Sequence, residues 1–143
     1  MPIIRDDDPE DFVTVDALVQ LSFLIQSVLQ RVAAEHELTI VQMRLLGILR
    51  DREPGMLELA NYLGLDKSSV TGLIDRAEKH GLVARTPVPG DGRMFKVSVT
   101  PKGRAITEQV ADQVDQEISK LVGKLNPNDR QRLIAIVARL LAS

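Results

Sequence analysis

Residues 57–85 have the sequence LELANYLGLDKSSVTGLIDRAEKHGLVAR, which predicts two short helices joined at a glycine. The first, over about 56–63, ends at Gly64, because glycine enters the left-handed conformation at little cost. Asp66 is placed to cap the second helix, over 67–80, since its carboxylate can accept from free amides of the first turn. Two short helices joined in this way are typical of a helix-turn-helix.

The helix expected over 67–80 has two different faces. Four apolar residues recur at a spacing of three and four and form the face directed at the core: Val70, Leu73, Ile74 and Ala77. The remaining positions are small, polar or basic, so this helix presents a surface that can form hydrogen bonds.

A β-hairpin is predicted next along the chain. Residues 82–86 have the sequence LVART, residues 87–92 are rich in Pro and Gly, and residues 93–99 alternate between apolar and polar. Two such runs around a turn are typical of a hairpin. A helix-turn-helix followed by a hairpin is a winged helix, so we expect a mainly α fold of the α+β type, with a wing over 85–99.

The segment before the helix-turn-helix begins with a capping box, Thr39-x-x-Gln42, and continues as a helix of about a dozen residues. Further out, both ends of the chain predict long helices. The N-terminal helix is apolar around most of its circumference, and a helix of this kind must be buried on more than one side. A long amphipathic helix opens at Thr100-Pro101, and Asn126-Pro127 starts the last one.

These terminal helices carry more apolar surface than one small domain can cover, so we expect them to pair with those of a second copy in a symmetric interface. The expected interface residues are Leu24, Val28, Leu133, Val137 and Leu140. The chain is thus divided into an N-terminal arm and dimerisation helix (1–35), a winged helix-turn-helix (36–104) and C-terminal dimerisation helices (105–143).

The composition excludes several classes of function. The chain has 143 residues, no Cys and two His, which leaves no thiolate chemistry and no zinc ribbon, and argues against a His-based metal centre. The sequence has no catalytic triad, that is, no nucleophile, base and orienting group at a recognisable spacing, and no Gly-rich phosphate loop. We therefore expect a binding protein rather than an enzyme, with no cofactor and no metal.

The sequence also favours a cytoplasmic protein without a membrane span. No stretch approaches the roughly 18 unbroken apolar residues that a span needs. The N-terminus, MPIIRDDDPED, is acidic and differs from a signal peptide.

Charge is unevenly distributed along the chain. Residues 1–65 carry 5 basic and 11 acidic residues, residues 66–104 carry 8 and 4, and residues 105–143 carry 5 of each. A basic middle segment in an acidic protein is what polyanion binding requires, although a chance cluster on a solvated face gives the same count.

Three segments together resemble a known family. They are LTIVQMRLLGIL (38–49), the stretch over 57–85, and DGRMFKVSVTPKG (91–103). Their order and spacing are similar to the LTxxQ, ELAxxLGLDxSTVTRLVDRLExxGLVxR and DxRxxxVxLTxxG patterns of the MarR family of winged-helix transcription regulators. The resemblance implies a homodimer, most often a repressor, which binds operator DNA and is released by a small anionic or phenolic ligand. The chain departs from the family at Gly72 and Gly92, where many members have longer side chains.

On this resemblance, the helix over 67–80 enters the major groove, where base edges present distinguishable donors and acceptors. The side chains expected to contact bases or phosphates are Lys67, Ser68, Ser69, Thr71 and Arg76. The alternative is a solvated helix start, in which Ser68 and Ser69 only satisfy free amides.

The wing supplies the second set of expected DNA contacts. Arg93 is placed to enter a minor groove, whose narrowness concentrates negative potential, and Asp91 to orient its guanidinium. The alternative is a surface ion pair that stabilises the turn, worth under about 1 kcal/mol. Arg85, Lys96 and Lys102 are expected to lie beside phosphates.

Two further interpretations concern ligands and partners. His36 stands where the family's ligand cleft would open, so it is the candidate for contact with an effector, whereas His80 is expected to cap a helix end. The partners expected are double-stranded DNA and a second copy of the chain. The competing hypothesis is a winged-helix module that binds another protein and does not contact DNA.

Overall fold

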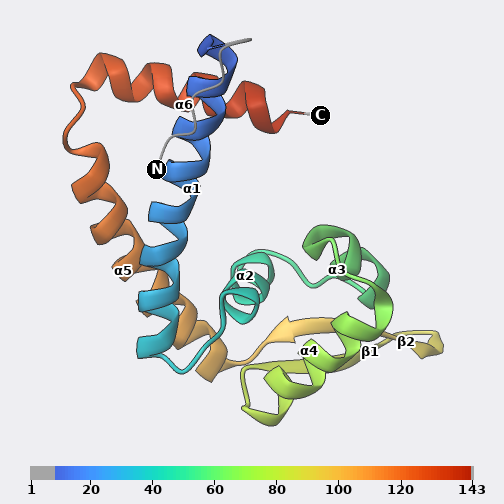
Figure 1. Ribbon diagram of the computed structural model, residues 1–143. Coiled ribbons are helices and arrows are strands. Elements are labelled where there is room, and N and C mark those ends of the chain that lie inside the picture. Colours follow the sequence, from blue (N-terminus) through green and yellow to red (C-terminus); the bar gives the residue numbers. More distant parts are fainter. Residues whose placement is uncertain (1–8, 143) are drawn as a thin grey trace. The chain divides into compact units, whose positions relative to one another are not determined.

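The computed structural model describes residues 9–142, and the side chains of all of these except 9–12, 91 and 93. Six helices and two strands follow one another along this part of the chain (Figure 1). They are α1 (Pro9–Glu35), α2 (Ile40–Leu49), α3 (Met56–Leu63), α4 (Lys67–Lys79), β1 (Val83–Val88), β2 (Asp91–Val99), α5 (Pro101–Val122) and α6 (Pro127–Leu141). This order confirms the predicted winged helix-turn-helix of mainly α class.

The contacts divide the chain into two compact units. One comprises Leu29–Asp112 and contains α2, α3, α4 and the hairpin; the other comprises the chain up to Val28 together with Gln113–Ser143. The roles assigned to residues 1–35, 36–104 and 105–143, in dimerisation and DNA binding, stay predictions.

Local signals in the sequence account for the helix ends in the larger unit. The capping box of α2 is present as predicted: the amide of Thr39 donates to Oε1 of Gln42 at 3.0 Å, and the amide of Gln42 donates to Oγ1 of Thr39 at 3.1 Å. Helix α3 ends at Gly64, whose φ of 65° lies in the left-handed region. The turn to α4 follows directly, so α3 and α4 form the expected helix-turn-helix.

The core of the larger unit joins the helices to the hairpin. Its largest fully buried side chains come from α2, α3, α4, β1 and β2: Leu45, Leu46, Leu49, Leu59, Val70, Ile74, Val83 and Val97. Leu57, which the sequence places among the apolar residues of α3, is 75% exposed instead.

The wing is an antiparallel pair of strands. Its register pairs Val83 with Val99 and Arg85 with Val97, and it shifts between Pro87 and Val88. The strands extend further toward the turn than the sequence predicts, because pairing resumes after this irregularity. On its other side, β2 is held by the segment before α3, where the amide of Val97 donates to the carbonyl of Pro54 at 2.9 Å.

Helix α5 begins against the turn that links α4 to β1. The Thr100 hydroxyl donates to the carbonyl of Gly81 at 2.5 Å, and the amide of Gly103 donates to the Thr100 hydroxyl at 3.0 Å. A Cβ on Gly103 would lie 2.0 Å from the carbonyl oxygen of Leu82. Glycine at this position therefore allows the first turn of α5 to pack directly on the backbone.

The terminal helices leave large apolar side chains exposed. None of the residues of α6, all of which are described, is buried, and Ile134, Leu140 and Leu141 are 61%, 64% and 79% exposed. Residues Val13–Glu35 of α1 are long and apolar enough to cross a membrane by length and composition alone, with a mean hydropathy of 1.4. A helix that packs on another chain passes the same test.

Candidate nucleic-acid interface

Helix α4 is fixed by its buried face, which leaves the opposite face open. Val70, Leu73, Ile74 and Ala77 are buried, as the spacing predicts. Lys67, Ser68, Ser69 and Arg76 are exposed, and Thr71 is half-buried. The five α4 side chains predicted to contact DNA thus lie outside the buried face of one helix.

The start of α4 is organised around the carboxylate of Asp66. Its Oδ1 accepts from the amide of Ser69 at 2.7 Å and from the hydroxyl of Ser68 at 2.8 Å. The amide of Ser69, followed by the side chains of Ser68 and Ser69, holds the pKa of Asp66 below its ordinary value. Asp66 therefore stays charged and keeps the first turn in place.

These contacts limit what the hydroxyl groups can offer a ligand. The Ser68 proton is directed at Asp66, and the Thr71 hydroxyl donates to the carbonyl of Lys67 at 2.9 Å. Each hydroxyl oxygen retains acceptor capacity. In this arrangement Ser68 and Thr71 are suited to accept from exocyclic amino groups of bases, and Lys67 supplies the donors.

Arg76 folds back along α4 over Gly72. A Cβ at position 72 would lie 3.3 Å from Nη1 of Arg76, so the absence of a side chain leaves room for the guanidinium. Beside it lies an open groove of about 620 Å³ between α2 and α4. Its lining residues are Thr39, Val41, Gln42, Leu65, Ser68, Ser69, Gly72, Leu73 and Arg76.

Arg85 connects the first wing strand to α4. Its Nη2 lies 2.7 Å from Oδ1 of Asp75 and its Nη1 lies 2.8 Å from Oε1 of Glu78. Asp75, followed by Glu78, raises the pKa of Arg85 above its ordinary value, although partial burial opposes this. Its guanidinium is thus directed at α4 and forms two ion pairs, and its predicted place beside a phosphate stays a prediction.

The other predicted DNA contacts of the wing and of the start of α5 differ in what the structure shows of them. The side chains of Asp91 and Arg93 lie outside the part of the structure that is described, so their predicted roles are not addressed by it. Lys96 lies opposite Gly55 and lines a hollow with residues of α2 and α5. Lys102 donates to the carbonyl of His80 at 2.9 Å, so it closes the end of α4.

The two histidines occupy different kinds of position. His80 is the C-terminal cap residue of α4 and is exposed. His36 is half-buried in the short connection between α1 and α2. A role for His36 in contact with an effector stays a prediction.

The residues predicted to form the dimer interface lie on α1 and α6. Leu24, Val137 and Leu140 are 47%, 39% and 64% exposed, and Val28 and Leu133 are half-buried. Their exposure in a single chain means that they are available to a partner.

Comparisons with known proteins agree with this architecture. Residues 36–94 match the sequence model of the MarR family. The HTH-type transcriptional regulator PecS of Dickeya dadantii is 25% identical over 139 residues, which cover 94% of this chain and 84% of that protein. The homoprotocatechuate degradative operon repressor of Escherichia coli is 27% identical over 134 residues, which cover 92% and 89%.

A solved structure shares the fold over most of its length. The crystal structure of RV1404 from Mycobacterium tuberculosis superposes with a TM-score of 0.78 at 28% identity, and the match covers 94% of this chain and 92% of that one. The match extends beyond residues 36–94, so the terminal helices belong to the shared fold.

Proposed function

The chain belongs to the MarR family of transcriptional regulators, and on that premise we propose that it is a homodimeric repressor that binds palindromic double-stranded operator DNA. The observation that carries the proposal is the outward face of α4, where Lys67, Ser68, Ser69 and Thr71 lie at the start of the helix. A helix start that presents small polar and basic groups suits the major groove.

In this proposal Lys67 donates to bases or phosphates, Ser68 and Thr71 accept from base edges, and Arg76 contacts the backbone from the groove beside α2. Support comes from the exposure of Arg76 and from the hydrogen bonds that already use the protons of Ser68 and Thr71. Direct readout by short side chains is modest, because a hydroxyl can pair with several bases.

The wing is proposed to reach the minor groove through Arg93, which Asp91 orients. Arg85 is proposed to position the wing, since its two ion pairs fix the wing strand to α4. Lys96 is proposed as a phosphate contact at the edge of the wing. The basic character of residues 66–104 supports a polyanion as the partner of this surface.

The second copy is proposed to pair through α1 and α6, whose apolar side chains are exposed in one chain. In such a dimer the two α4 helices would face half-sites about one helical turn of DNA apart, roughly 34 Å. We propose that α1 is covered by this pairing rather than by lipid, and that the protein acts in the cytoplasm without catalytic activity or a cofactor.

Release by a small anionic or phenolic ligand is carried over from the family resemblance, with His36 as the residue nominated to contact it. A titration of phenolic acids against the protein–DNA complex, repeated with His36→Ala, tests this part. If some acid releases the DNA equally well from both proteins, His36 has no role in recognition.

Selection of bound sequences from random DNA tests the central proposal. The expected result is an inverted repeat, and its affinity should fall steeply with salt, by about 0.9 in the log–log slope for each phosphate contacted. Arg93→Ala should weaken binding without lowering the melting temperature. A flat salt response together with no enriched sequence would favour the module that binds another protein.

A further inference from the structure

A hollow of about 540 Å³ lies where the end of α2, the end of β2 and the start of α5 meet. It belongs entirely to the Leu29–Asp112 unit. Its lining residues are Leu49, Arg50, Asp51, Arg52, Glu53, Lys96, Val99 and Arg104. Three separate elements therefore contribute polar residues to the lining of one depression.

Positive charge dominates this hollow. Four basic residues line it, Arg50, Arg52, Lys96 and Arg104, against the two carboxylates of Asp51 and Glu53. Within the described part of the chain, none of the four cations forms an ion pair with a carboxylate. The lining of the hollow therefore carries a net charge of +2, and Glu108 lines an adjoining cavity with Arg50 and Arg104.

The basic groups also have hydrogen-bond donors to spare. Arg104 donates through Nη1 to the carbonyl of Arg50 at the long distance of 3.5 Å, and the guanidinium carbon of Arg52 lies 4.8 Å from the centre of the Tyr62 ring. Among the residues that the structure describes, the side chains of Arg50 and Lys96 make no hydrogen bond. A guanidinium carries five N–H donors and an ammonium three.

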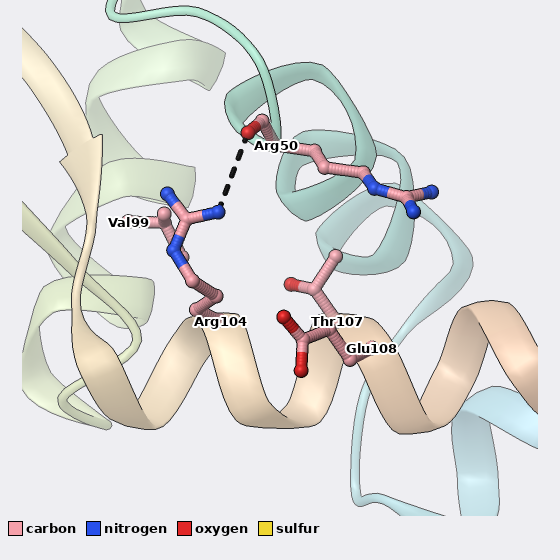
Figure 2. Close-up of a pocket in the computed structure, with 5 residues that line it drawn as sticks. All are labelled: Arg50, Val99, Arg104, Thr107 and Glu108. Carbon is pink, nitrogen blue, oxygen red and sulfur yellow. Dashed lines mark hydrogen bonds between the residues drawn. The ribbon is translucent and has the colours of Figure 1, made fainter.

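The side chains of the two arginines point in different directions. Figure 2 shows the Arg104 guanidinium directed at the Arg50 carbonyl, while the Arg50 side chain extends the other way. A cavity of only about 20 Å³, bounded by Val99, Thr107 and Glu108 as well as the two arginines, adjoins the hollow. That volume suits a single water molecule, whereas the larger hollow admits a polyatomic anion.

We propose that this hollow is a site for a phosphate group, held by Lys96 and Arg104 together with Arg50, whose exposed side chain would turn toward the anion. Phosphate matches the chemistry because its oxygens accept from the planar fork of a guanidinium in pairs and from an ammonium singly. The group can come from a free phosphate anion or from the backbone of DNA. The free-anion form of the proposal does not depend on the regulator function.

A phosphate bound at this site would link elements that are far apart in the sequence. Arg50 follows α2, Lys96 lies on β2, and Arg104 lies in α5 one residue after Gly103. A bound anion with two or more charges would cancel the repulsion among the three cations and tie the start of α5 to the end of α2. Binding should therefore raise the melting temperature of the protein.

Calorimetric titration of the full-length chain with inorganic pyrophosphate at constant ionic strength tests the free-anion source. Lys96→Gln and Arg50→Gln should each weaken binding about tenfold, the loss expected for one charge-assisted hydrogen bond. Lys124→Gln is the matched control, because Lys124 is exposed and does not line the hollow. Neither Arg50 nor Lys96 supports the fold through a side-chain hydrogen bond, so both variants should melt like the wild type.

The DNA source is tested with Arg50→Gln alone, since Lys96 already has a role in the proposed interface. If pyrophosphate does not bind, but Arg50→Gln lowers the salt slope of DNA binding by about one, the phosphate belongs to the DNA backbone. The proposal is overturned if pyrophosphate does not bind and the slope is unchanged, or if Lys124→Gln loses as much affinity as the two test variants. A wild-type protein that binds pyrophosphate but no DNA would overturn only the regulator function.

Discussion

The guanidinium of Arg85 lies 2.7 Å from the carboxylate of Asp75, so the first strand of the wing is tied to the exposed side of α4. Glu78 adds a second ion pair at 2.8 Å and also accepts from the backbone amide of Arg85 at 3.3 Å. The side chain of Arg85 is 23% exposed, against 58% for that of Asp75. The cluster therefore fixes two proposed DNA-contacting elements relative to each other.

A mutant cycle separates this positioning role from direct phosphate contact. Arg85→Ala and the variant Asp75→Ala/Glu78→Ala, which removes both ion-pair partners, should each lower operator affinity. The variant with all three changes should lose little more than either, because both break the same link. The coupling in stability should stay under about 1 kcal/mol, since these are surface pairs. If Arg85→Ala weakens binding and Asp75→Ala/Glu78→Ala does not, Arg85 contacts a phosphate directly.

The Asp66 cap makes the start of α4 sensitive to acid. Because the pKa of Asp66 is lower in the folded protein than the ordinary 3.8, its charge stabilises the fold above that pH, and the contribution is lost as the pH falls through the folded-state pKa. Asp66→Asn keeps an acceptor but removes the charge. It should therefore lower the melting temperature at pH 7.

The melting temperatures of Asp66→Asn and the wild type, followed by circular dichroism, should then approach each other below about pH 3.8 and become equal at lower pH. Asp112, which is exposed and accepts no hydrogen bond among the described residues, provides the control position. Asp112→Asn should leave the melting temperature unchanged at both pH values. If the difference in melting temperature between Asp66→Asn and the wild type stays constant as the pH is lowered, the charge of Asp66 is not what stabilises the helix start.

Gly103 and Gly47 are predicted to respond oppositely to alanine. A Cβ at Gly103 would meet the Leu82 oxygen at 2.0 Å and Cγ2 of Val99 at 2.8 Å, whereas nothing lies within 4 Å of a Cβ at Gly47. Gly103→Ala should cost about 3 kcal/mol, as overpacking does. Gly47→Ala, inside α2, should stabilise by up to about 1 kcal/mol. Urea unfolding measures both, and equal effects would contradict the close packing of α5 on Leu82.

The elements with local signals were predictable from the sequence. The Thr39–Gln42 capping box, the Gly64 helix end and the Asp66 cap each depend on residues at most three positions apart, and all three are present. The same holds for the buried face of α4, whose spacing is set by the helix period. These signals, together with the hairpin, define the winged helix.

The features that depend on distant contacts were not predictable. Arg85 pairs with residues seven and ten positions away, and nothing in the local pattern separates such a partner from a phosphate. Leu57 has the spacing of a core residue, yet tertiary packing leaves it exposed. The acceptor character of Ser68 and Thr71 follows from where their protons point, which composition does not reveal.

The exposed leucines of α6 and α3 give a matched test of the dimer. Leu140 is 64% exposed and Leu57 is 75% exposed, but only Leu140 belongs to the proposed interface. Leu140→Glu should raise the dimer dissociation constant by about 100-fold, because a carboxylate replaces a side chain that dimerisation buries. Leu57→Glu should leave it unchanged. Light scattering across a concentration series measures both.

A monomeric wild type would contradict this pairing. If the wild type is monomeric at all concentrations, something other than a second copy must bury the apolar side chains of α1 and α6. Flotation of the protein with lipid vesicles would then show that a membrane buries them, in keeping with the length and hydropathy of Val13–Glu35. A membrane-bound α1 should keep the protein with the vesicles at high salt, because burial of apolar surface, unlike attraction to charged headgroups, is not screened by ions.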